Sequence, residues 1–226
     1  MAILFSSCCP YGPQRQSDRI SHAERDTRDG GTPQVYPEGR RCEARLRELG
    51  IRYRSYQGEG ASGVVRPIIL EGPIGGIEVR PRWGNEVHSV TDCRVLLALH
   101  RWAPSLRRAG VTEIQYFSRL RPNARVARTG RRSSHASALA IDVGWMRLED
   151  GSELSILDDW EDRDRGEEPC GGRYREDRHS ALMRRTVCEA AEAGIFQVLI
   201  TPHHDHAHRN HLHLEVKPGQ TQVWLR

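Results

Sequence analysis

Two short stretches carry residues whose types and spacing suit chemistry at a metal ion. The first lies near the C-terminus, where polar and apolar residues alternate from His211 to Glu215. Successive side chains of a β-strand point to opposite faces of a sheet, so this alternation predicts a strand with His211, His213 and Glu215 on one face. Leu212 and Leu214, which lie between them, then point into a core.

The second stretch carries His135 and, seven positions later, Asp142, which belongs to the apolar run 139–143. A carboxylate among Ala, Ile and Val is costly to bury unless a cation or hydrogen-bond donors hold it. Two imidazoles and one carboxylate are ligand types of a catalytic zinc site, which leaves one position for water. We therefore hypothesise that His135, Asp142 and His213 bind one Zn²⁺, with His211 beside the bound water.

Each of these features has a structural alternative when it is taken alone. Pairs of His on one strand face are common at protein surfaces, and a His followed by an Asp is commoner still. The combination is more specific, because the alternating strand and the core-embedded carboxylate occur in the same chain.

Elements able to position these residues can be read from the pattern of apolar residues and turn signals. Helices are predicted from Cys42 to Gly50, from the cap Thr91-Asp92 to near Gly110, and from the cap Ser180 to Gly194. Strands are predicted over 51–56, 64–70, 76–79, 111–117, 139–145 and 196–200, with a hairpin turn at Asp150-Gly151. The predicted fold class is α+β: a central antiparallel sheet bears Asp142 and the His-x-His strand, and two main helices pack on it.

The chain divides by composition. Residues 1–38 are polar and charged, with few hydrophobic residues, which predicts a disordered N-terminal arm. We expect one domain over 39–218, made of an N-terminal packing subdomain (39–85) and a core with the metal site (86–218). Residues 219–226 are expected to form a peripheral tail.

Charge and hydropathy exclude some function classes. The net charge is +4 and Lys217 is the only lysine, but the arginines are spread along the chain and interleaved with Asp and Glu. A nucleic-acid surface would instead cluster its basic residues, so no nucleic-acid partner is predicted. No stretch approaches the ~20 apolar residues of a transmembrane helix, and none is predicted. The oligomeric state is not predicted.

The chain has six cysteines and no Cys-x-x-Cys motif, which argues against a thiolate metal site. Cys170 and Cys188 flank a polar loop and a helix and could close it in an oxidising compartment. Cys42 and Cys93 lie in two predicted helices and either pair or are simply buried, so the connectivity stays open. No clear signal peptide is predicted, because the apolar residues 1–5 are too few for its central region.

The segment from about Cys42 to Val216 resembles the extensin-like C-terminal domain of bacteria. That family is related to D-Ala-D-Ala carboxypeptidases, murein endopeptidases and lysostaphin-type zinc peptidases. The two His/Asp blocks agree best, in order, spacing and flanking residues. The matching blocks are 115–119, 134–143, Asp150-Gly151, Asp159-Trp160 and 208–215.

The resemblance implies the fold of those zinc peptidases, a zinc site made by His135, Asp142 and His213, and a cell-wall peptide as substrate. It implies a periplasmic or extracellular location. It also points to Arg119 as the group that binds a peptide carboxylate, for which a guanidinium is suited, although a surface role is an equal alternative in so Arg-rich a chain. The chain departs from the family at Ser118, where a cysteine is usual.

The remaining site residues have expected roles around the metal. In the carboxypeptidase relatives a Glu three positions before the last His ligand is the general base, and Asn210 stands there in this chain. His211 is therefore assigned as the base, and His208 as its partner or as a donor to the oxyanion. Glu215 is expected to hold a ligand His or to form a salt bridge at the strand end, and Ser134 to contact a ligand or the substrate through its hydroxyl.

Other residues near the site are expected to be exposed. These are His203, His204 and His206 in the His-rich loop, and Asp159-Trp160 on an acidic face. The predicted function is a zinc-dependent hydrolase that cleaves peptide bonds in peptidoglycan stem peptides or cross-links. The alternative is a non-catalytic module of the same fold that holds zinc and binds the cell wall. A metal-dependent nuclease ranks last, since His ligands favour zinc over Mg²⁺.

Overall fold

A computed structural model describes residues 36–161, 169–171 and 177–226. In this part of the chain three α-helices accompany nine strands. The helices are α1 (Gly39–Glu48), α2 (Cys93–Arg108) and α3 (Arg178–Glu192). The strands are β1 (Tyr53–Ser55), β2 (Ile68–Leu70), β3 (Glu78–Pro81), β4 (Val111–Tyr116), β5 (Ala140–Leu148), β6 (Glu153–Ser155), β7 (Val198–Ile200), β8 (Leu212–Glu215) and β9 (Trp224–Leu225). Short 3-10 helices are η1 (Glu86–Ser89), η2 (Ser134–Ser137) and η3 (His206–His208).

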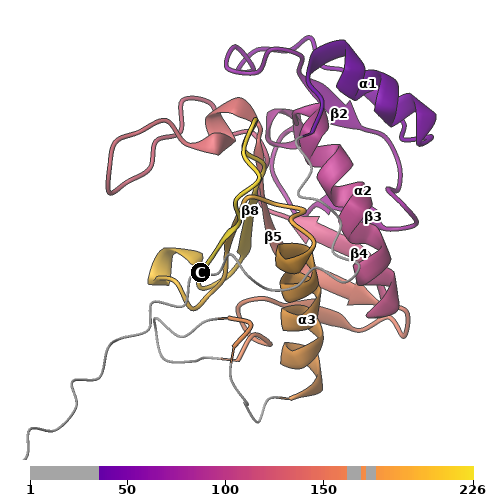
Figure 1. Cartoon of the computed structure of the whole chain (residues 1–226), viewed down its shortest axis with the longest axis vertical. Helices are drawn as coiled ribbons and strands as arrows, with labels where there is room; N and C mark the ends of the chain where they lie inside the picture. The colour runs from indigo at the N-terminus through magenta and orange to yellow at the C-terminus, as the bar shows by residue number, and fades with distance from the viewer. Residues whose placement is uncertain (1–35, 162–168, 172–176) are drawn as a thin grey trace, which may run out of the picture.

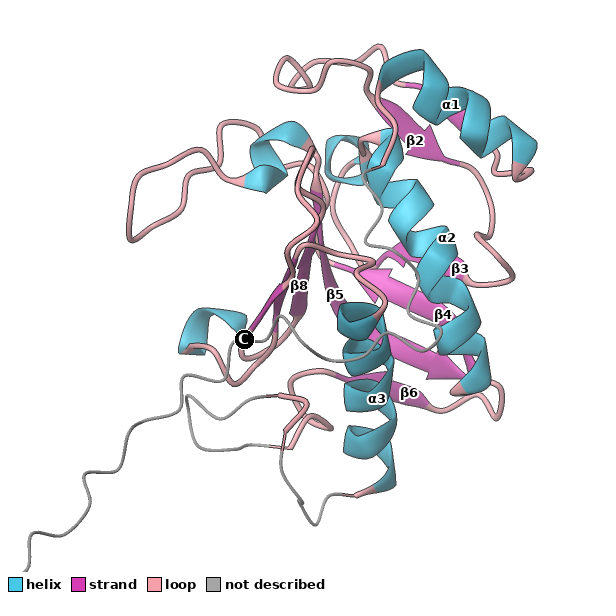
Figure 2. Ribbon diagram, in the orientation of Figure 1, coloured by secondary structure: helices cyan, strands magenta, loops and turns pink. Residues whose placement is uncertain are grey.

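The main sheet has the strand order β3-β4-β5-β8-β7-β9, and β6 pairs with β5. The inner pairs are antiparallel, as predicted, but β3 pairs with β4 and β9 pairs with β7 in parallel. The architecture is thus α+β with a mixed sheet. Helices α2 and α3 lie together in front of the sheet in Figure 2. The indole N–H of Trp102 on α2 donates to the carbonyl of Thr186 on α3 at 2.9 Å.

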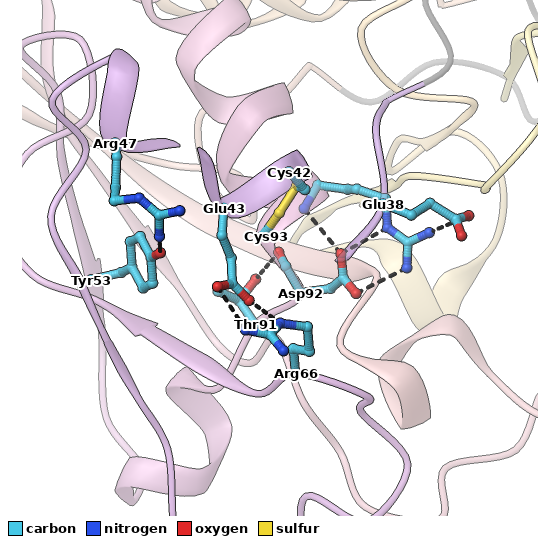
Figure 3. The surroundings of a disulfide bond; sticks show 10 residues. Glu38, Cys42, Glu43, Arg47, Tyr53, Arg66, Thr91, Asp92 and Cys93 are labelled. Carbon is cyan, nitrogen blue, oxygen red and sulfur yellow. Dashed lines mark hydrogen bonds and ion pairs between the residues drawn. A yellow bond between two sulfur atoms is a disulfide. The ribbon is translucent and has the colours of Figure 1, made fainter. Parts of the chain in front are cut away.

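The N-terminal block is only partly a separate layer. Strands β1 and β2 form their own antiparallel pair, and α1 packs against α2 (Figure 1). A disulfide between Cys42 and Cys93 joins α1 to the first residue of α2, and Figure 3 shows the ion pair of Glu43 and Arg66 beside it. Strand β3, however, belongs to the main sheet. Helix α1 was also predicted, and it packs against α2, so α2 and α3 are the two main helices beside the sheet, as expected.

Several boundaries differ from those predicted because contacts distant in sequence decide them. Tyr36 is buried, and its hydroxyl donates to the carbonyl of Ile195 at 2.8 Å, so the folded part begins before 39. The predicted arm otherwise lies outside the described residues. The expected tail contains β9, which extends the sheet. The N-cap of α3 is Asp177 rather than Ser180, whose hydroxyl instead accepts from the backbone N–H of Glu161.

A bulge in β5 decides which side chains share a face with Asp142. Gln115 pairs with Trp145 and Tyr116 pairs with Val143, so the residue between them, Gly144, has no partner in the register. An extra residue of this kind reverses the alternation of side chains along a strand. Trp145 therefore shares the face of Asp142, opposite the helices.

A search of the described residues for a membrane-spanning helix found none with the length and apolar character that a bilayer requires.

Candidate metal centre

The three predicted ligands meet because of strand register. In the antiparallel pairing of β5 with β8, Asp142 lies directly opposite His213, so their side chains leave the sheet side by side. His135 comes from η2, the short helix that precedes β5. All three side chains are buried, with exposed fractions of 0%, 3% and 8% for His135, Asp142 and His213. The structure therefore brings together the set chosen from the sequence.

Their inward atoms form a nearly equilateral triangle. His135 Nε2 lies 3.0 Å from Asp142 Oδ1 and 3.1 Å from His213 Nδ1, and the last two atoms are 3.0 Å apart. In a tetrahedral zinc site with bonds of 2.0–2.1 Å, neighbouring ligand atoms are about 3.3 Å apart. The donor types and the spacing thus fit a zinc ion bound by these three residues.

Hydrogen bonds on the outer side of each ring fix which nitrogen faces the triangle. His135 Nδ1 donates to the backbone carbonyl of Arg119 at 2.8 Å, and His213 Nε2 donates to Glu215 Oε2 at 3.3 Å. Glu215 in turn accepts a hydrogen bond from the hydroxyl of Ser134. With their outer nitrogens protonated, neutral rings present lone pairs inward, which is the state required of a metal ligand.

The buried charges shift the pKa values in opposite directions. Burial raises the pKa of a carboxyl group, but the two imidazoles hold the pKa of Asp142 well below its usual value. Burial lowers the pKa of His135. It has the same effect on His213, but hydrogen bonds to Asp142 and Glu215 outweigh it and raise the pKa of His213 to about 9. Without metal, His213 is protonated at pH 7, and its positive charge lies beside the Asp142 carboxylate.

His211 and His208 lie beside the triangle, and their side chains are 15% and 21% exposed. His211 Nε2 is 3.5 Å from Asp142 Oδ1, and its Nδ1 donates to the side-chain oxygen of Asn210 at 2.9 Å. The ring centres of His208 and His211 are 5.2 Å apart, and His208 Nδ1 donates to Asp205 at 2.7 Å. Burial lowers the pKa of His211 to about 4, so this ring is neutral at pH 7 with Nε2 free to accept a proton.

Arg119 occupies a different place from the one predicted for a carboxylate-binding group. Its side chain is only 1% exposed, with the guanidinium carbon 4.3 Å from the centre of the Tyr116 ring. One nitrogen donates to the carbonyl of Ser89 at 3.4 Å. In this conformation Arg119 contributes to the site through its backbone carbonyl, and its contact with a substrate carboxylate stays a prediction. Ser134 contacts Glu215, as described above.

His203 and Trp160 were expected to be exposed, and both are buried, at 3% and 5%. The Trp160 indole N–H donates to His203 Nε2 at 3.1 Å, because a buried indole needs an acceptor. The other two loop residues, His204 and His206, are exposed, as predicted. The contact between Trp160 and His203 could not be predicted from sequence periodicity, because the two residues are distant in the chain.

Two further residues of the site were not assigned from the sequence. The hydroxyl of Ser118 lies 3.4 Å from Asp142 Oδ2, the carboxylate oxygen that faces away from the triangle. Asp205 caps η3 and holds His208. The sequence offered a weak signal for each: Ser118 follows a predicted strand, and Asp205 lies among histidines.

These observations define an α+β domain with a preassembled His–Asp–His site on the open face of a mixed sheet. The chain matches the family model described as "Extensin-like protein C-terminus" over residues 40–224, and it belongs to this family. No curated protein and no solved structure matches the chain.

Proposed function

We propose that the protein is a zinc-dependent hydrolase that cleaves amide bonds in the peptides of bacterial peptidoglycan, with the fold of zinc peptidases of the D-Ala-D-Ala carboxypeptidase and lysostaphin type. The observation that carries the proposal is the triangle of His135 Nε2, Asp142 Oδ1 and His213 Nδ1, with sides of 3.0–3.1 Å. The peptide substrate class is proposed from the resemblance to zinc peptidases given above.

A bound Zn²⁺ would supply a water of lowered pKa and a Lewis acid for the scissile carbonyl. The chain supplies the groups around it. His211 is the proposed general base, because its Nε2 is a free acceptor beside Asp142 and its Nδ1 is fixed by Asn210. His208, whose Nδ1 donates to Asp205, is the proposed partner: with its Nε2 also protonated, it would donate a hydrogen bond to the substrate, while His211 returns the proton that it took to the leaving amine.

The proposed location is periplasmic or extracellular, and two disulfides support it. Cys42 pairs with Cys93 and Cys170 pairs with Cys188, with Cα–Cα distances of 6.2 and 5.6 Å. Disulfides persist in oxidising compartments and are rare in the cytosol. The peptidoglycan that the proposal requires lies in the same compartment.

The test is digestion of purified sacculi and of a defined muropeptide, followed by mass spectrometry. Zinc-loaded protein should release peptides, and a chelator should stop the release. His213→Ala and Asp142→Ala should lose bound zinc, whereas His211→Ala should retain zinc and lose hydrolysis. His206→Ala, an exposed imidazole of the adjacent loop, is the matched control and should behave as the wild type. Unchanged zinc stoichiometry in the first two variants would refute the ligand assignment.

A non-catalytic zinc-holding module that binds the cell wall is the second candidate. The observation that favours it is the pKa of about 4 for His211, which makes the ring a weak base. Zinc binding and sacculus binding with no released peptide would select this candidate over the hydrolase.

A further inference from the structure

Three aromatic rings form a cluster on the same face of the sheet as the metal centre. Trp83 follows β3, Phe117 follows β4, and Trp145 lies on β5 just after the bulge at Gly144. Ring centres are 5.4 Å apart for Trp83 and Phe117, 5.1 Å for Trp83 and Trp145, and 4.7 Å for Phe117 and Trp145. We refer to these three residues as the aromatic platform.

The rings of the platform pack against one another but leave Trp83 open to solvent. The rings pack edge to face or tilted, the arrangements that aromatic pairs prefer. Phe117 sits directly over Gly144, where an added Cβ would lie 2.7 Å from the Phe117 ring. Trp83 is nevertheless 56% exposed, among the largest exposed fractions of the hydrophobic side chains. A large ring held in place and left open to solvent is a feature of binding surfaces.

Charged planar groups surround the rings at fixed positions. The guanidinium of Arg82 lies 4.8 Å from the centre of the Trp145 ring and donates to Gln115 at 2.7 Å and to Glu153 at 2.8 Å. Arg147 also donates to Glu153, at 3.1 Å. The side chains of Arg82, Arg147 and Glu153 are partly exposed, at 33%, 47% and 29%. They can therefore hydrogen-bond a ligand that lies on the rings.

The platform is continuous with the metal centre. The ring centres of Phe117 and His211 are 5.9 Å apart, and His211 Nε2 lies 3.5 Å from Asp142. A ligand that extends over Phe117 from the metal centre would reach Trp145 and Trp83 next. The platform thus extends the site in one direction, toward the β3 edge of the sheet.

We propose that the aromatic platform binds a sugar ring of the glycan strand, next to the peptide at the metal centre. A pyranose presents apolar C–H groups on its faces and hydroxyl groups around its rim, which matches aromatic rings framed by guanidinium and carboxylate groups. The inference rests on the proposed function, because peptidoglycan carries its peptides on a glycan chain. Self-association is a poor alternative. A stable interface buries about 800 Å² of surface per partner, and one exposed ring with two half-buried neighbours offers much less area.

The test measures binding of a peptide-free probe, a tetramer of N-acetylglucosamine, to the full chain by titration calorimetry. The wild type should bind, and Trp83→Ala should raise the Kd about tenfold by removing the exposed ring. Trp83→Phe should restore part of the affinity. Trp224→Ala is the matched control, since Trp224 is 39% exposed on β9 at the opposite edge of the sheet. Its Kd should equal that of the wild type.

Absence of wild-type binding at millimolar probe, an unchanged Kd in Trp83→Ala, or an equal loss in Trp224→Ala would each overturn the proposal. A chelator separates it from the proposed hydrolase. Probe binding retained after metal removal supports a platform that acts independently, whereas binding lost with the metal contradicts it. Retained probe binding in a protein that releases no peptide would refute the hydrolase and leave the platform standing.

Discussion

At the scale of single residues, the site is a group of acceptors held together against their mutual repulsion. Two imidazole nitrogens and one carboxylate oxygen converge, and the hydrogen bonds to the Arg119 carbonyl and Glu215 prevent either ring from turning its N–H inward while it is neutral. A buried cluster of lone pairs is costly without a cation. The ligand set therefore needs either a metal or a proton, and the two compete for it.

This competition predicts proton release on zinc binding. His213 has a pKa of about 9 without metal, so it is protonated at pH 7, whereas the lowered pKa of His135 leaves that ring neutral. Zinc must displace the proton on His213, so at least one proton should leave per ion at pH 7, and ionisation of a zinc-bound water would add to this count. Zinc affinity should rise with pH up to about 9. Titration calorimetry at pH 7 in buffers of different ionisation enthalpy measures the count.

The same shift has a defined sign for stability. The pKa of His213 is raised from 6.5 to about 9 in the folded state, so its protonation stabilises the metal-free protein fully below pH 6.5. That stabilisation is lost as the pH rises through 9.

The control for the calorimetric proton count is His206→Ala, which should release the same number of protons on zinc binding as the wild type. Zinc binding at pH 7 without proton release would contradict the pKa assigned to His213.

At the scale of elements, the sequence predicted the site because its signals were local. Alternation identified the strand of His213, and an apolar run identified the strand of Asp142. The bulge at Gly144 was not predicted, because a pattern of period two cannot show an extra residue. The placement of Trp145 on the face of Asp142, and with it the platform, depends on that bulge. The burial of His203 and Tyr36 was also missed, since their partners Trp160 and Ile195 are distant in sequence.

The turn between η2 and β5 contains local strain that can be measured. Ala138 has φ 53° and ψ 29°, a left-handed conformation that disfavours residues other than Gly, and it is fully buried. Left-handed backbone costs a non-Gly residue about 1–2 kcal/mol. Ala138→Gly removes this cost, but it also removes a buried methyl group and adds freedom to the unfolded chain.

A matched substitution isolates the strain. Ala136 is 2% exposed in η2, two residues before Ala138, and Ala136→Gly has the same two costs without relief of strain. Urea unfolding should therefore show Ala138→Gly to be more stable than Ala136→Gly by about 1–2 kcal/mol. Equal destabilisation by both substitutions would show that the left-handed conformation of Ala138 is not strained.

At the scale of the whole molecule, two disulfides join elements that pack around the sheet to other parts of the chain. Cys42–Cys93 joins α1 to the start of α2, as Figure 3 shows, and the backbone N–H of the preceding residue, Asp92, donates to the carbonyl of Ala138 at 3.0 Å. The first bridge is therefore tied, through Asp92, to the turn at Ala138 that follows η2, the short helix that carries His135. Cys170–Cys188 joins the middle residue of the described segment 169–171 to α3.

The lengths of chain that the two bridges close predict unequal contributions to stability. The cysteines are 51 residues apart in Cys42–Cys93 and 18 apart in Cys170–Cys188. By the loss of loop-closure entropy in the unfolded chain, the bridges contribute about 4 and about 3 kcal/mol. Urea unfolding of Cys42→Ala/Cys93→Ala and of Cys170→Ala/Cys188→Ala should show both pairs destabilised, the first more. Because Asp92 also fixes the turn before Asp142, the first variant should bind zinc more weakly, whereas the second should bind it as the wild type does. The opposite order of stability, with zinc affinity lost only in the second variant, would show that the site does not depend on the packing of α1 against α2.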